Sequence, residues 1–149
     1  MNKKIGCPSG WEVKNNRCVP VTKSAKIDKI VFKKPVDWVK ERHGGYREQY
    51  IDSKQLKQLL RNKFIHPDVE INVRGENSRF IDFVKEYPQC EVEVGVPAPD
   101  RLATGDVLAI SAIRCKAKKV NKAMRNDFID SFHDADELLH RTELRAWYD

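Results

Sequence analysis

The chain has 149 residues, of which 40% are hydrophobic and 34% are charged, and its formal net charge is +6. This length suits one domain with a real core, and no apolar run approaches the roughly 20 residues that a membrane-spanning helix needs. The basic amino-terminal residues are not followed by an apolar segment, so we expect no secretory signal and a cytoplasmic protein.

Positive charge is concentrated in the first part of the chain. Residues 1–63 contain 16 Lys and Arg against 6 Asp and Glu, whereas residues 64–149 contain 12 against 16. The two parts therefore carry charges of +10 and −4. A basic region of this kind favours phosphate-rich or acidic partners, and its attraction weakens as salt is added.

Residues 7–20 predict a miniature β-hairpin. Asn15 and Asn16 suit a tight turn that needs positive φ, between arms at residues 11–14 and 17–19. Residues beyond this hairpin lack an apolar pattern until residue 27, which is typical of a linker.

The cysteines of the hairpin, Cys7 and Cys18, are spaced so that a disulfide is allowed. In the cytoplasm a reduced pair is the expected form. Zinc is the sharper alternative, but the chain has neither a Cys-x-x-Cys nor a His-x-x-x-His knuckle, so no metal is predicted. The remaining candidate ligands for such a site are Cys90, Cys115, His43, His66, His133 and His140.

The linker at residues 20–26 divides the chain into an appendage, residues 1–26, and an α/β domain, residues 27–149. The domain is predicted to open with a strand at residues 27–32. A short helix then begins at Pro35, because proline suits a first helical turn.

That short helix is expected to end before Gly44. The next helix begins at Asp52 or Ser53, either of which is a good cap. It is amphipathic, with lysines and arginines on its outer side. Its apolar positions are Leu56, Leu59 and Leu60.

A glycine-containing turn follows the half-exposed strand predicted at residues 69–73. Backbone N–H groups at a turn that opens a helix can hold an anion, and Asn77 or Ser78 would cap that helix. Arg74 and Arg79 flank the turn and would hold a phosphate through paired hydrogen bonds. A capped helix start with two surface arginines is the alternative.

Two further strands are predicted at residues 90–96 and 107–113, the second after a turn at residues 104–106. The second strand has one polar residue in seven, so we expect it to be buried on both faces and central in its sheet. Residues 120–139 predict the longest helix, with an interruption at Asp134 to Asp136, and residues 142–148 a last strand. This order predicts an α/β (α+β) fold, a single mixed sheet of about five strands with helices packed on it.

The densest acid-free basic cluster of the chain follows the strand at residues 107–113. Six cations fall within twelve residues, with no carboxylate among them, so only solvent or a bound anion relieves their repulsion. A solvated strand end is the alternative. Together with Arg74 and Arg79, the predicted phosphate-binding residues are Arg114, Lys116, Lys118, Lys119, Lys122 and Arg125.

No Walker loop, nucleophile elbow, zincin helix, dinucleotide fingerprint or EF-hand is present. The sequence therefore predicts a non-catalytic basic module, without cofactor, that binds nucleic acid or a nucleotide. The alternative is an interaction or assembly subunit, a homo-oligomer or part of a larger complex, whose +10 and −4 regions attract each other.

One resemblance covers about two thirds of the chain, from Ser53 onward. The pattern includes Gly-x-x-Ser at Gly75 to Ser78, a Gly-Asp turn at residues 105–106, and an apolar strand that ends in Arg114. This pattern is similar to small viral ring nucleases of the anti-CRISPR type. The resemblance implies a protein of a virus-infected cell that cleaves cyclic oligoadenylate, although the histidine of that family is replaced by Glu76.

Overall fold

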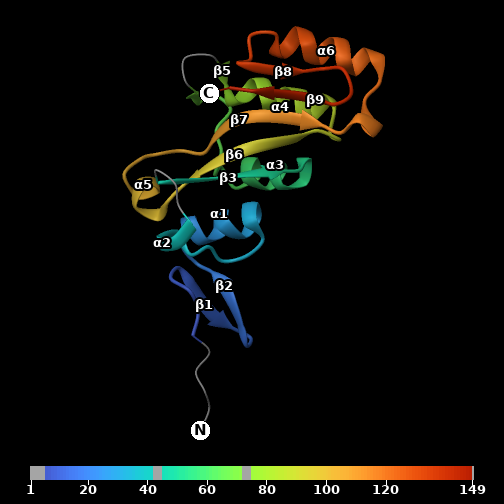
Figure 1. Ribbon diagram of the computed structural model, residues 1–149. Coiled ribbons are helices and arrows are strands. Elements are labelled where there is room, and N and C mark those ends of the chain that lie inside the picture. The colour runs from blue at the N-terminus through green and yellow to red at the C-terminus, as the bar shows by residue number, and fades with distance from the viewer. Residues whose placement is uncertain (1–5, 42–44, 72–74, 149) are drawn as a thin grey trace.

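The computed structural model describes residues 6–41, 45–71 and 75–148 (Figure 1). Predictions that concern Gly44 or residues 72–74 therefore lie outside the part described. The elements in chain order are β1 (Trp11–Lys14), β2 (Arg17–Pro20), α1 (Lys23–Phe32), α2 (Trp38–Glu41), β3 (Tyr46–Ile51), α3 (Ser53–Arg61), β4 (Glu70–Ile71), β5 (Gly75–Glu76), α4 (Asn77–Glu86), β6 (Glu91–Pro97), α5 (Pro99–Ala103), β7 (Ala109–Cys115), the 3₁₀ turn η1 (Ala117–Lys119), α6 (Lys122–Phe132), β8 (Glu137–Leu139) and β9 (Leu144–Trp147).

The main sheet has five strands in the order β3-β6-β7-β9-β8. Every neighbouring pair is antiparallel. The predicted α/β fold, with a sheet of about five strands and a separate hairpin, is confirmed. β7 is the middle strand, as expected from its apolar sequence, and it begins two residues later than predicted. The prediction that it is buried on both faces is wrong, because side chains on one of its faces, such as Ser111 and Arg114, stay partly exposed.

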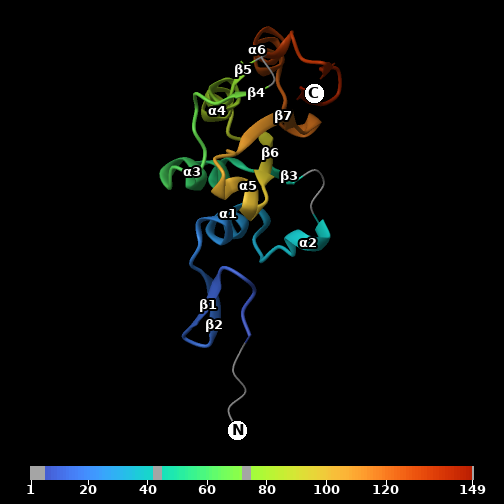
Figure 2. The same ribbon diagram turned by 90° about the vertical axis from the view of Figure 1, so that its left-hand side faces the viewer.

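Helices cover one face of this sheet, and Figure 2 shows α3 and α4 on the same side of the strands. Side chains alternate along β6, so that Val92 and Val94 are buried while Glu93 lies on the opposite face. The buried face packs against aromatic rings of α4 and α6, whose centroids lie 4.9 to 5.5 Å apart. These rings belong to Phe80, Phe83, Phe128 and Phe132. The opposite face of the sheet is left to polar side chains.

Helix α1 occupies the segment predicted as a strand at residues 27–32, so that prediction is wrong. The helix begins at Lys23, inside the predicted linker. Thr22 Oγ1 caps it by accepting a hydrogen bond from a backbone N–H three residues later, at 3.1 Å. Ile27 and Val31, one helical turn apart, are both buried in the core. A short apolar run is compatible with a helix or a strand, and here the packing of this face against the core determines that it is a helix.

The strands β3 and β8 are absent from the sequence-based prediction. The helix expected at Pro35 starts at Trp38 instead. The helix expected at residues 120–139 ends at Phe132, and the chain turns at the predicted interruption before it forms β8.

The hairpin of β1 and β2 is confirmed, with Asn15 and Asn16 at φ values of 52° and 62°. Cys7 and Cys18 form a disulfide, with their Cα atoms 5.6 Å apart. The expected reduced pair is therefore wrong. Cys90 and Cys115 are buried free thiols, and no cluster of metal-binding side chains exists among the residues searched, which are those described.

Candidate functional site

The predicted lysines lie in the segment of residues 116–122, here called the lysine loop. It connects β7 to α6 and folds as a 3₁₀ turn, in which Lys119 N donates to Lys116 O at 2.9 Å. Asn121 then caps α6 by accepting a hydrogen bond from Met124 N at 2.9 Å. These contacts use backbone groups and the Asn121 side chain, and no lysine side chain takes part in them.

All four lysines of the loop are exposed. None of them forms an ion pair with another residue in the described part of the chain. Because no carboxylate neutralises them locally, their ammonium groups repel one another and attract anions. The group consists of Lys116, Lys118, Lys119 and Lys122.

Arg114 precedes the loop. Its side chain lies on the face of the sheet opposite the helices, here called the open face. Its guanidinium lies 3.7 Å from the centroid of the Tyr50 ring, and its Nε donates to Glu91 Oε1 at 3.1 Å. The side chain remains 39% exposed. Arg114 therefore has both a carboxylate partner and an exposed edge next to the lysine loop.

Other polar side chains gather beside Arg114 on this open face. Ser111 Oγ donates to Glu93 Oε1 at 3.2 Å. Tyr50 Oη and Arg145 Nε are buried and have no hydrogen-bond partner in the described structure. The face thus offers two arginines and an aromatic ring beside acidic side chains.

The pKa values on this face reflect that mixture of charges. Burial raises the pKa of Glu93, and the negative charge of Glu48 raises it further. Burial also raises the pKa of Tyr50, and Glu93 adds to the rise while Arg145 opposes it. The sequence did not identify Tyr50 and Arg145 as neighbours, because they are far apart in the chain. Tyr50 lies on β3, which pairs with β6, and Arg145 lies on β9, which pairs with β7.

Arg125 contacts the connection between β8 and β9. Its Nη2 donates to Arg141 O at 3.2 Å, while its Nε is buried without a partner. Arg125 therefore fastens α6 to the carboxyl-terminal strands.

Arg79 is partly exposed and is bonded to the carboxyl-terminal part of the chain. Its two terminal nitrogens donate to the two carboxylate oxygens of Asp134 at 3.1 and 2.7 Å. It also donates to Ser131 O at 2.6 Å and to Tyr148 Oη at 3.1 Å. The hydrogen bonds from Arg79 are the main cause that lowers the pKa of Asp134 to about 2. We therefore assign Arg79 to the fold, while its predicted companion Arg74 lies outside the described residues.

Asn77, one of the two residues predicted to cap this helix, is used to bond distant backbone groups. Its side chain is fully buried, and Nδ2 donates to His66 O at 2.9 Å and to Leu108 O at 3.2 Å. Its Oδ1 accepts a hydrogen bond from Ile110 N at 2.9 Å. Asn77 therefore joins α4 to the start of β7.

Comparison of the chain with known proteins identifies no relative. No family model matches the chain. No curated protein and no solved structure matches it either. The resemblance to ring nucleases therefore gains no further support. None of the described helices is long and apolar enough to span a membrane.

Proposed function

We propose that the protein binds a phosphate-bearing partner through the lysine loop. The observation that carries the proposal is the group of four exposed lysines without a carboxylate partner among the described residues. Arg114 extends this cationic surface onto the edge of the open face. When such lysines neutralise phosphates, they release the counterions condensed on a nucleic acid, and this release is the main source of sequence-independent affinity.

A polyanion suits this surface better than a single nucleotide. Lysine ammonium groups act as mobile point charges, whereas a guanidinium offers a fixed fork for one phosphate. The arginine with a forked pair, Arg79, is already bound to Asp134. Exposed lysines on a short loop match the repeated charges of a nucleic-acid backbone, and we therefore place nucleic acid ahead of a nucleotide.

The test is a fluorescence-anisotropy titration with a short labelled oligonucleotide, single-stranded and duplex, at several salt concentrations. Affinity is expected to fall steeply between about 50 and 200 mM salt. Replacing all four loop lysines by glutamine should weaken binding at every sequence and reduce the slope of log K against log salt by about 3.

A matched control removes the same charge from elsewhere. Lys26 and Lys29 on α1 and Lys54 and Lys57 on α3 are also exposed. Their fourfold glutamine variant lowers the net charge equally, so it should reduce the affinity less than the loop variant does. Equal losses in the two variants would show a diffuse charge effect and would contradict a site at the loop.

The compartment belongs to the same proposal. We place the protein in the cytoplasm with its nucleic-acid partner. A disulfide such as Cys7–Cys18 persists mainly in oxidising compartments, so in the cytoplasm it must resist reduction. Fractionation of cells that express the full chain is expected to recover it with the cytosol, and recovery from an oxidising compartment would contradict this location.

A further inference from the structure

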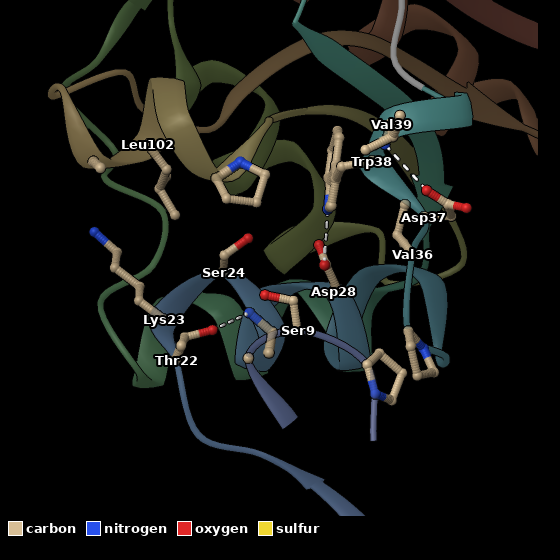
Figure 3. Close-up of a pocket in the computed structure, with 16 residues that line it drawn as sticks. Ser9, Thr22, Lys23, Ser24, Asp28, Val36, Asp37, Trp38, Val39 and Leu102 are labelled. Carbon is tan, nitrogen blue, oxygen red and sulfur yellow. Dashed lines mark hydrogen bonds between the residues drawn. The ribbon is translucent and has the colours of Figure 1, made fainter. Parts of the chain in front are cut away.

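A cavity of about 900 Å³ lies far from the lysine loop, between the hairpin, the start of α1, residues 35–39 and α5 (Figure 3). This volume is within the range of about 300 to 1,000 Å³ that is typical of small-molecule sites. Much of its wall is apolar and comes from the ring of Trp38 together with Val36, Pro99 and Leu102. The hairpin contributes Pro8 to Gly10, directly after the disulfide-bonded Cys7.

Two polar side chains of α1 face this cavity. Ser24 and Asp28 are one helical turn apart, and Figure 3 shows both pointing toward α5 and Trp38. Asp28 is only 3% exposed. Its Oδ2 accepts a hydrogen bond from Trp38 Nε1 at 2.9 Å, but its Oδ1 is buried without a partner in the described structure, as is Ser24 Oγ.

Such unpaired atoms are unfavourable in a folded protein. A buried acceptor that lacks a hydrogen bond costs about 1 to 3 kcal/mol, and more when it is charged. The great majority of buried polar atoms have a partner for this reason. Two unpartnered oxygens on one wall of one cavity therefore mark a place where a ligand would supply the missing donors.

The charges around the cavity decide which donor fits. Asp28 and Asp37 are its acidic lining residues and Lys23 is its basic one, so the lining has a net negative charge. Arg47 also acts on Asp28 electrostatically, but its guanidinium lies over the Phe32 ring, 4.7 Å from the centroid, and it does not line the cavity. An anionic ligand is disfavoured here, whereas a cation would neutralise the buried carboxylate.

We propose that this cavity binds a small organic amine, whose ammonium group donates hydrogen bonds to Asp28 Oδ1 and Ser24 Oγ while its apolar body packs against Trp38 and Leu102. The ring of Trp38 also attracts a cation through its π face. This binding site is separate from the lysine loop and does not depend on the proposed function.

The experiment uses a panel of arylalkylamines, namely 2-phenylethylamine, tryptamine and 1-naphthylmethylamine, each paired with the alcohol of the same skeleton. Binding to the full chain is measured by ligand-detected NMR and calorimetry at neutral pH. The amine of at least one pair should bind saturably and about tenfold or more tightly than its alcohol, because only the amine carries a charge-assisted hydrogen bond.

Asp28→Asn keeps the shape of the side chain and removes its charge. This substitution should abolish the preference for the amine over the alcohol, whereas Asp82→Asn, which changes an exposed carboxylate on α4, should leave it unchanged. Ser24→Ala provides a second variant if Asp28→Asn does not fold, and we expect it to weaken amine binding about threefold to tenfold.

Three results would overturn the proposal. One is equal binding of every amine and its alcohol. Another is an amine affinity that survives Asp28→Asn in a folded protein. The third is the lack of saturable binding by all amines in the panel, which would indicate that water alone satisfies Asp28 and Ser24.

Discussion

The carboxyl group of Asp28 is buried on folding, but only one of its two oxygens has a hydrogen-bond partner in the described structure. Burial is the main cause that raises its pKa from 3.8 to about 6, against smaller opposing effects of Trp38 and Arg47. Between about pH 4 and pH 6 the native protein therefore holds a proton that the unfolded chain has released. The contribution of Asp28 to the free energy of unfolding falls as the pH rises through this window, by up to about 3 kcal/mol.

Asp28→Asn should remove this pH dependence. We expect the variant to gain stability relative to the wild type as the pH rises from about 4.5 to about 7.5, because the asparagine never bears the buried charge. Urea unfolding of both proteins at the two pH values measures the difference. Since other titrating groups are common to both proteins, a difference that stays constant with pH would contradict the assignment.

Asn77 is the buried polar side chain on which the junction of α4 and β7 depends. Its three hydrogen bonds all go to backbone groups of distant segments. Asn77→Ala leaves two carbonyls and one N–H without this partner, so we expect a loss of about 3 kcal/mol in the free energy of unfolding. Asn126→Ala, at an exposed position of α6, is the control and should change it by less than about 0.5 kcal/mol.

Denaturant unfolding followed by circular dichroism measures both asparagine variants. If Asn77→Ala is no more destabilising than Asn126→Ala, the buried hydrogen bonds of Asn77 do not hold this junction. Asn77 also explains why the turn at residues 74–79 has a site-like sequence, since a small polar residue at a helix start is equally suited to a cap and to a buried clamp.

The hairpin is an element that depends on its disulfide. It rests on the start of α1 through Gly10 O, which accepts hydrogen bonds from Val21 N at 2.9 Å and Thr22 N at 3.3 Å. Its strands are four residues each, and none of their side chains is fully buried. Two-stranded hairpins of this kind are marginal in water, so the Cys7–Cys18 bond supplies much of the stability of this element.

Removal of the disulfide should therefore loosen the hairpin and leave the main sheet intact. With Cys7→Ser and Cys18→Ser together, trypsin should cleave after Lys14 and Arg17 much faster than in the oxidised protein. Cleavage after Lys54 on α3 is the internal control and should not change. Equal acceleration at both places would mean that the hairpin and the sheet unfold as one unit.

Helices and strands with a clear apolar periodicity could be predicted from the sequence. Those whose secondary structure depends on packing against distant segments could not. β6, β7 and β9 follow from alternating or continuous apolar residues, and α3 from its leucines. β3 is an edge strand in which Ile51 alone is buried, so its sequence shows no apolar alternation. α1 has a short run of branched residues that is compatible with a strand until it packs against β3 and α3.

The two candidate sites differ in the same way. The lysine loop is predictable because its charges are contiguous in the chain. The cavity is not, because its walls come from the hairpin, α1, residues 35–39 and α5. The unpartnered oxygen of Asp28 can be recognised only in the folded structure, where these four segments come together.

At the scale of the whole molecule, the lysine loop and the cavity lie at opposite ends of the sheet. β7 starts after the connection from β6, which contains α5, and it ends at the lysine loop (Figure 1). It has seven residues, which span about 20 Å. No lining residue of the cavity belongs to the loop. Two sites that share no mobile element are expected to have no coupling free energy.

This separation predicts independence of the two sites. Asp28→Asn should change the affinity for the oligonucleotide by less than about twofold, because exposed charges at this distance are screened at physiological salt. The fourfold glutamine variant of the lysine loop should likewise leave the amine affinity within about twofold. The double variant, measured by anisotropy and calorimetry, completes the cycle. A coupling larger than about 1 kcal/mol would show that the sheet transmits a conformational change between its ends, since screened charge alone does not produce one.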